Sequence, residues 1–131
     1  MMDKERVHLD LEKIDLYGWE GSVNKYKFDS VIRGINAGDR FPPVRVFKIN
    51  EHIYQLTDLA TEDESRKEGG HTRSFAHYKT KKPLECVVEG MMEHVDFDEF
   101  GEINIRDLKL DDGDYARTQF EKIKKEDQKY R

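Results

Sequence analysis

Alternating apolar and charged residues near the start of the chain predict a β-strand over residues 7–17, VHLDLEKIDLY. The segment FDSVIRGINAG, residues 28–38, instead predicts a helix, because its apolar residues recur at helical spacing. Asp29 suits the N-cap of that helix, and Gly38 suits its C-terminal end. The apolar face of this predicted helix consists of Val31, Ile32 and Ile35.

The middle of the chain predicts a β-hairpin, a short helix and a further strand. Two prolines, Pro42 and Pro43, cannot continue the helix, and the β-branched segment VRVFKI follows them. The turn NEH leads back into IYQLTDL, which completes the hairpin. A charged loop, ATEDESRKE, precedes a helix predicted from Thr72 to about Lys79, and the apolar run LECVVEG then predicts a strand.

The last third of the chain predicts a second hairpin and a terminal helix. HVDFDEFGEINIRDLKL alternates apolar and polar residues on both sides of EFGE, as two paired strands do. DDGDYARTQFEKIKKEDQKYR predicts a helix with Asp114 as its N-cap, an acidic start and a basic end. Its apolar stripe consists of Ala116, Phe120 and Ile123.

Composition narrows the class of protein. A chain of 131 residues suits a single domain, and 36% hydrophobic against 39% charged residues indicates a modest core under a charged surface. The net charge of −5 lacks the basic excess typical of a duplex-DNA binder, although Lys79, Lys81 and Lys82 form a local basic cluster. No apolar run approaches the roughly 18 residues of a membrane span, and the first residues lack the apolar core of a signal peptide, so we expect a cytoplasmic protein.

Metal and thiol chemistry find little support in the sequence. The five histidines have no zinc-type spacing and there is no cysteine pair, so we expect no structural metal. The single cysteine, Cys86, cannot form an internal disulfide, and its apolar surroundings predict a buried core thiol.

The segment EGGHTRSFAHY, residues 68–78, has the composition of an anion site. A helix N-terminus exposes backbone N–H groups, and Gly69 and Gly70 would let the backbone approach a ligand closely. Arg73 offers a two-pronged donor, Thr72 a hydroxyl, and His71 a group that can donate to a phosphate or move a proton. A plain turn is the alternative, with Thr72 acting as a cap and Arg73 pairing with a carboxylate.

The order of these segments resembles the ParB/sulfiredoxin superfamily over about residues 9–90. The matching pieces are SVIRGINAGDRFPPVRVF, IYQLTDL and GGHTRSFAHYKTKKPLECVV. The resemblance implies an α+β fold, with a small mixed sheet, short helices and a C-terminal hairpin and helix at residues 91–131. His71 stands where sulfiredoxins have their cysteine and Thr72 where the family has histidine, so we do not expect sulfiredoxin chemistry. No helix-turn-helix domain follows the match, so we do not expect sequence-specific binding to a DNA operator.

The resemblance also implies a ligand and a set of site residues. The ligand is a nucleotide triphosphate such as ATP, together with Mg²⁺. Glu68 and His71 are the catalytic candidates, and Asp58 and Glu68 are candidate metal ligands. The candidate phosphate-binding residues are Gly69, Gly70, His71, Thr72, Arg73 and Arg40.

These features leave three functions open, of which the third is a degenerate domain that kept the fold, lost its ligand and serves only as an interaction scaffold. The first is a nucleotide-binding domain, with hydrolysis of a nucleoside triphosphate, phosphotransfer or nuclease activity as possible reactions. The alternative is a non-catalytic module that binds nucleic acid or protein in a plasmid, viral or partition system. DNA is therefore a second candidate partner, a membrane is not expected, and the sequence does not determine the oligomeric state.

Overall fold

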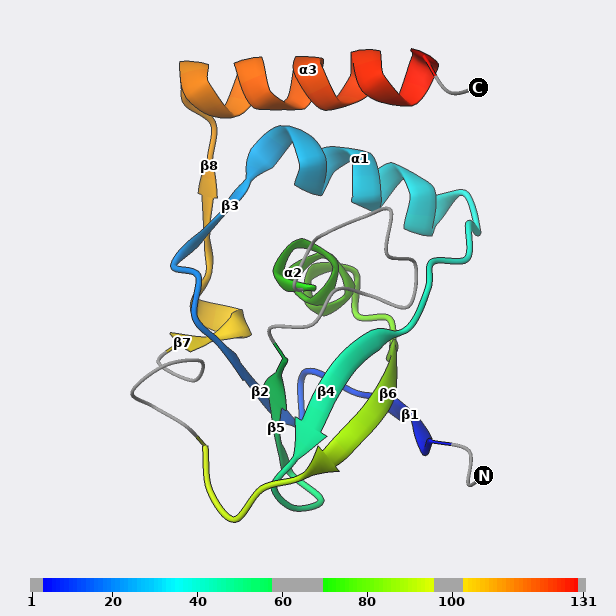
Figure 1. Ribbon diagram of the computed structural model, residues 1–131, viewed down its shortest axis with the longest axis vertical. Coiled ribbons are helices and arrows are strands. Elements are labelled where there is room, and N and C mark those ends of the chain that lie inside the picture. The colour runs from blue at the N-terminus through cyan, green and yellow to red at the C-terminus, as the bar shows by residue number, and fades with distance from the viewer. Residues whose placement is uncertain (1–3, 58–69, 96–102, 130–131) are drawn as a thin grey trace.

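The computed structural model of the 131-residue chain describes residues 4–57, 70–95 and 103–129. Groups of strands are separated by single helices along these residues (Figure 1). The helices are α1 (Lys25–Asn36), α2 (His71–Thr80) and α3 (Asp114–Lys129), with a 3₁₀ turn, η1 (Ile105–Asp107). The strands are β1 (Arg6–Leu9), β2 (Asp15–Gly18), β3 (Ser22–Asn24), β4 (Val44–Lys48), β5 (Ile53–Leu56), β6 (Leu84–Met91), β7 (Ile103–Asn104) and β8 (Lys109–Asp111).

A mixed sheet of six strands forms one side of the fold, in the order β1-β6-β4-β5-β2-β7. β4 runs parallel to β6 and β2 parallel to β5, whereas the pairs β1–β6, β4–β5 and β2–β7 are antiparallel. β3 and β8 form a separate parallel pair. The predicted α+β class with a small mixed sheet is confirmed, and so is the antiparallel hairpin formed by β4 and β5.

The core lies between the sheet and α2, which Figure 1 shows between α1 and the strands. Phe75 and Ala76 of α2 are 3% and 0% exposed, and the Phe75 ring packs 5.4 Å from the ring of Phe28 in α1. Cys86 in β6 is fully buried, as predicted, and burial raises the pKa of its thiol. Burial of these apolar side chains is the main force that holds α2 against the sheet.

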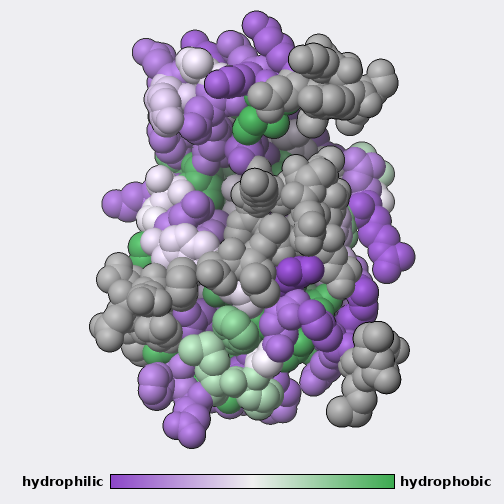
Figure 2. Space-filling view, in the orientation of Figure 1, coloured by the Kyte–Doolittle hydropathy of each residue, from purple (hydrophilic) through white to green (hydrophobic). Residues whose placement is uncertain are grey.

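The outer layer is polar. α3 lies along α1 on the side away from the sheet (Figure 1), and most described residues on the face in Figure 2 are hydrophilic. Among the described residues, no helix combines the length and the apolar character that a membrane span requires.

Two predicted element boundaries are wrong near the N-terminus. Residues 7–17 do not form one strand, because a turn at Asp10 separates β1 from β2. The Asp10 carbonyl accepts a hydrogen bond from Ile14 N at 2.9 Å, and its carboxylate accepts one from Glu12 N at 3.1 Å. A local Asp-centred turn of this kind competes with an extended strand.

The helix α1 begins earlier than predicted. Asn24, not Asp29, is its N-cap, since the Asn24 side chain accepts hydrogen bonds from Tyr26 N and Lys27 N at 2.9 and 3.3 Å. Asp29 lies inside the helix and pairs with Lys25 at 2.7 Å. The C-terminal end is as predicted, because Gly38 follows the helix with a left-handed φ of 83°.

The described half of the predicted C-terminal hairpin is not a single strand. Ile103–Asn104 pairs with β2, whereas Lys109–Asp111 pairs with β3, and the 3₁₀ turn lies between them. Asn104 starts that turn by accepting a hydrogen bond from Arg106 N at 3.1 Å. Residues 96–102, the other part of the prediction, lie outside the described residues. Asp114, predicted as the N-cap of the terminal helix, is its first helical residue.

Candidate functional site: a polar pocket at the start of α2

Gly70 caps α2 in a backbone conformation that favours glycine. Its φ is +92°, and a Cβ at this position would lie 2.6 Å from Val44 Cγ1. The Gly70 carbonyl accepts the first helical hydrogen bond, from Ser74 N at 2.9 Å. Because Gly70 is the cap, Thr72 does not cap the helix and lies one residue inside it.

His71, the first residue of α2, is packed against the connection between β2 and β3. The side chain is 3% exposed, and Nε2 accepts hydrogen bonds from Trp19 N at 3.1 Å and Glu20 N at 3.3 Å. Since Nε2 accepts, the proton of the neutral ring lies on Nδ1, which is 3.4 Å from a carboxylate oxygen of Glu20. Burial lowers the pKa of His71 to about 4, so the imidazole is neutral at pH 7. Gly18 leaves the space that the ring occupies.

Arg73 lies on another side of α2. It is 8% exposed, its Nη1 donates to the Pro42 carbonyl, and its guanidinium lies 5.1 Å from the centre of the Phe41 ring. These contacts join α2 to the segment that connects α1 with β4. Arg40 is exposed, and its Nη2 lies 3.7 Å from a carboxylate oxygen of Glu85.

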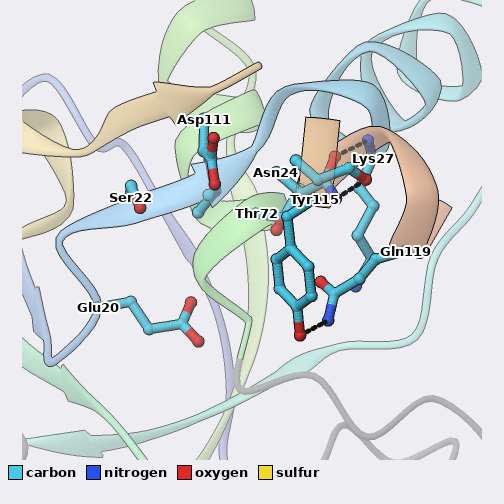
Figure 3. Close-up of a pocket in the computed structure, with 10 residues that line it drawn as sticks. Glu20, Ser22, Asn24, Lys27, Thr72, Asp111, Tyr115 and Gln119 are labelled. Atoms are coloured by element: carbon cyan, nitrogen blue, oxygen red, sulfur yellow. Dashed lines mark hydrogen bonds between the residues drawn. The ribbon is translucent and has the colours of Figure 1, made fainter. Parts of the chain in front are cut away.

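A pocket of about 240 Å³ lies where α2, α3 and the β3–β8 pair meet (Figure 3). Thr72 is 8% exposed and lines this pocket, and its hydroxyl makes no hydrogen bond within the described part of the chain. A hydroxyl that lines a pocket without a protein partner is available to donate to a bound group. The described lining residues are Glu20, Ser22, Val23, Asn24, Lys27, Thr72, Asp111, Tyr115, Ala116 and Gln119.

Charges of both signs surround the pocket. Glu20 and Asp111 contribute carboxylates and Lys27 an ammonium group, so the described lining carries a net charge of −1 with its other residues neutral. Figure 3 shows Glu20 and Asp111 on one side of Thr72, and Tyr115 and Gln119 on the other. The first turn of α2 adds the partial positive charge of a helix N-terminus.

The pocket brings together few of the residues predicted from sequence. Among the described residues of that set, Thr72 lines the pocket, and His71 reaches it through Glu20. Arg73 and Arg40 make their contacts elsewhere. Asp58, Glu68 and Gly69 lie outside the described residues.

Sequence reasoning missed the part of the lining that the C-terminal segment supplies. Asp111, Tyr115 and Gln119 reach the pocket because β8 pairs in parallel with β3 and α3 then runs along α1. The local pattern around these residues resembles an ordinary charged helix surface. No signal in the sequence therefore identified them.

The described residues contain no group of three or more His, Cys, Asp or Glu side chains that could hold a metal ion by themselves. Comparisons with protein-family models, with curated proteins and with solved structures give no match to the chain.

Proposed function

We propose that the chain is a nucleotide-binding domain that holds the phosphates of a nucleoside triphosphate, with Mg²⁺, in the pocket at the start of α2. The observation that carries this proposal is the position of the Thr72 hydroxyl, which lies in the first turn of the ten-residue helix α2. Thr72 as a residue is 8% exposed and lines the pocket, and its hydroxyl has no partner among the described residues. Phosphate oxygens suit such a position, because they accept from hydroxyls and are favoured at a helix N-terminus.

The charge of the lining makes the proposal depend on Mg²⁺. A bare phosphate is disfavoured beside Glu20 and Asp111, which outnumber Lys27. Mg²⁺ commonly binds through one or two carboxylates together with substrate phosphates, and two carboxylates line this pocket. Glu20 and Asp111 are the described carboxylates of the lining, and either one could supply a ligand to the ion, which would neutralise phosphate charge when bound.

His71 acts in this proposal as a positioning residue. Its neutral ring presents Nδ1–H to the Glu20 carboxylate while Nε2 accepts from the backbone. This contact, at 3.4 Å from Nδ1 to the carboxylate oxygen, is how His71 would help to orient Glu20 if that carboxylate binds a metal. A catalytic role for His71 or Glu68 remains a prediction.

The resemblance to the ParB/sulfiredoxin superfamily supports the same ligand class, because the turn and helix of that family hold nucleotide phosphates. Arg73 matches the arginine of the family turn, and its contacts with Phe41 and Pro42 indicate a role in holding the turn in place. We therefore assign phosphate contact to Thr72 and support of the turn to Arg73.

Thermal unfolding with ATP, CTP, GTP and ADP, each with and without Mg²⁺, tests the proposal. A nucleotide present at 100 times its dissociation constant stabilises the folded state by about 2.7 kcal/mol. We expect such a shift with Mg²⁺ and a much smaller shift without it. Failure of every nucleotide to shift the wild-type protein would overturn the proposal.

Two pairs of variants locate the binding site. Thr72→Val removes the hydroxyl and keeps the branched shape, so we expect it to weaken nucleotide binding; Thr80→Val at the other end of α2 is its control. Asp111→Asn should weaken the dependence on Mg²⁺, whereas Asp112→Asn, beside it but outside the described lining, should not. Equal effects of the two members of either pair would contradict the assignment.

The reaction and the alternative function are tested on the same protein. Release of phosphate from a bound nucleotide would establish hydrolysis, and nicking of a supercoiled plasmid would establish nuclease activity. Binding of duplex DNA with a steep salt dependence, without any nucleotide shift, would favour the non-catalytic module instead.

A further inference from the structure

The size of the pocket limits how much of a nucleotide it can enclose. Its volume of about 240 Å³ lies below the roughly 300–1,000 Å³ of pockets that enclose whole drug-sized ligands. If the triphosphate occupies the pocket beside Thr72, the nucleoside must lie at the rim. The further inference therefore rests on the proposed function and concerns the residues at that rim.

We infer that Tyr115 is the platform on which the nucleobase stacks. Its side chain lines the pocket yet the residue is 73% exposed, so the ring stands at the opening and not in the interior. The Tyr115 hydroxyl accepts a hydrogen bond from Gln119 Nε2 at 2.9 Å, which holds the ring in one orientation (Figure 3). An exposed aromatic ring at the mouth of a polar pocket suits the flat face of a base.

The backbone that carries Tyr115 is fixed to the rest of the pocket. The next residue, Ala116, is 2% exposed, and its carbonyl accepts a hydrogen bond from Asn24 Nδ2 at 2.7 Å. Asn24 Oδ1 caps α1, and the Asn24 backbone pairs with Asp111 where β3 and β8 run side by side. The platform is therefore built on regular elements, and binding needs little rearrangement of the backbone.

This arrangement divides recognition between two parts of the chain. The start of α2 recognises phosphate, and α3 recognises the nucleoside. Since every base has a flat face, stacking on Tyr115 selects a nucleotide over a polyphosphate, and does not choose strongly among bases.

Binding of Mg²⁺–ATP and of Mg²⁺–tripolyphosphate, measured by titration calorimetry on the full chain, tests this inference. Base–aromatic stacking predicts that wild-type protein binds ATP about 5- to 140-fold more tightly than tripolyphosphate. Tyr115→Ala should remove that difference by weakening the binding of ATP more than the binding of tripolyphosphate. Tyr115→Phe keeps the ring and should retain most of the preference for ATP.

The possible failures are distinguishable. Equal wild-type affinities for ATP and tripolyphosphate, both dependent on Mg²⁺, would overturn stacking while leaving the phosphate site intact. Loss of the preference in Tyr115→Phe as well as in Tyr115→Ala would show that the hydroxyl matters and would also overturn stacking. Binding of neither probe to the wild type would overturn the proposed function and this inference together.

Discussion

Replacing Gly18 with alanine tests how tightly the end of β2 packs against the first residue of α2. A Cβ at this position would lie 2.5 Å from His71 Nε2, 2.8 Å from His71 Cδ2 and 3.1 Å from Leu56 Cδ1. The imidazole cannot move away without cost, because Nε2 accepts backbone hydrogen bonds from Trp19 and Glu20 and the side chain is buried.

The expected magnitude follows from these contacts. An extra methyl group forced into a packed interior costs about 1–3 kcal/mol. Loss of one hydrogen bond to the backbone adds about 1 kcal/mol. We therefore expect Gly18→Ala to lower the free energy of unfolding by about 2–4 kcal/mol, and Tm by roughly 6–16 °C in a domain of this size.

Gly21→Ala is the matched control. A Cβ there would meet Ile103 Cδ1 at 3.6 Å, which is an ordinary contact, so we expect a change within about 0.5 kcal/mol. Urea unfolding followed by circular dichroism gives both values under the same conditions. If Gly18→Ala is as stable as the wild type, or if both variants lose the same stability, the packing described around His71 is refuted.

Three further predictions concern the same region and the core. The pKa of His71 falls from 6.5 to about 4 on folding, so the unfolded chain takes up its proton first as the pH falls. The contribution of neutral His71 to the free energy of unfolding is complete above pH 6.5 and decreases by about 3 kcal/mol toward pH 4. His71→Gln should lack this decrease. If the free energy of unfolding of the two proteins changes in parallel with pH, the prediction is contradicted. Asn24→Ala should lower the free energy of unfolding by about 1–3 kcal/mol, because it removes a helix cap and the bond to the Ala116 carbonyl, whereas exposed Asn36→Ala should cost less than half as much. The Cys86 thiol, buried and with a raised pKa, should react with a thiol reagent at least 100-fold more slowly in the native protein than in denaturant, and comparable rates would mean that the core around β6 is open.

The elements that sequence predicted well are those with strong local signals. Pro42 and Pro43 follow α1 and lead into β4, and Gly70 marks the start of α2. The errors have a common physical cause, which is that a short polar side chain can hydrogen-bond its own backbone. Asp10 interrupts the expected first strand in this way, and Asn24 starts α1 before the predicted cap.

The candidate site was less predictable than the fold. Thr72 was identified because a glycine-preceded helix start is a local pattern. Asp111 and Tyr115 were not, because their place in the pocket depends on pairing between β8 and β3, and hairpin alternation does not reveal a parallel partner more than eighty residues away. The role of Arg73 likewise depends on Phe41 and Pro42, which local sequence does not connect to α2.

The bond between Asn24 and the Ala116 carbonyl joins residues 92 positions apart and has a consequence for biosynthesis. All strands from β1 to β6, together with α1 and α2, leave the ribosome before β8 and α3 do, so the hydrophobic interior can consolidate while the pocket still lacks one wall. The same order leads us to expect that local opening of the folded protein starts with β8 and α3, so that their amide protons exchange before those of β4 and β6.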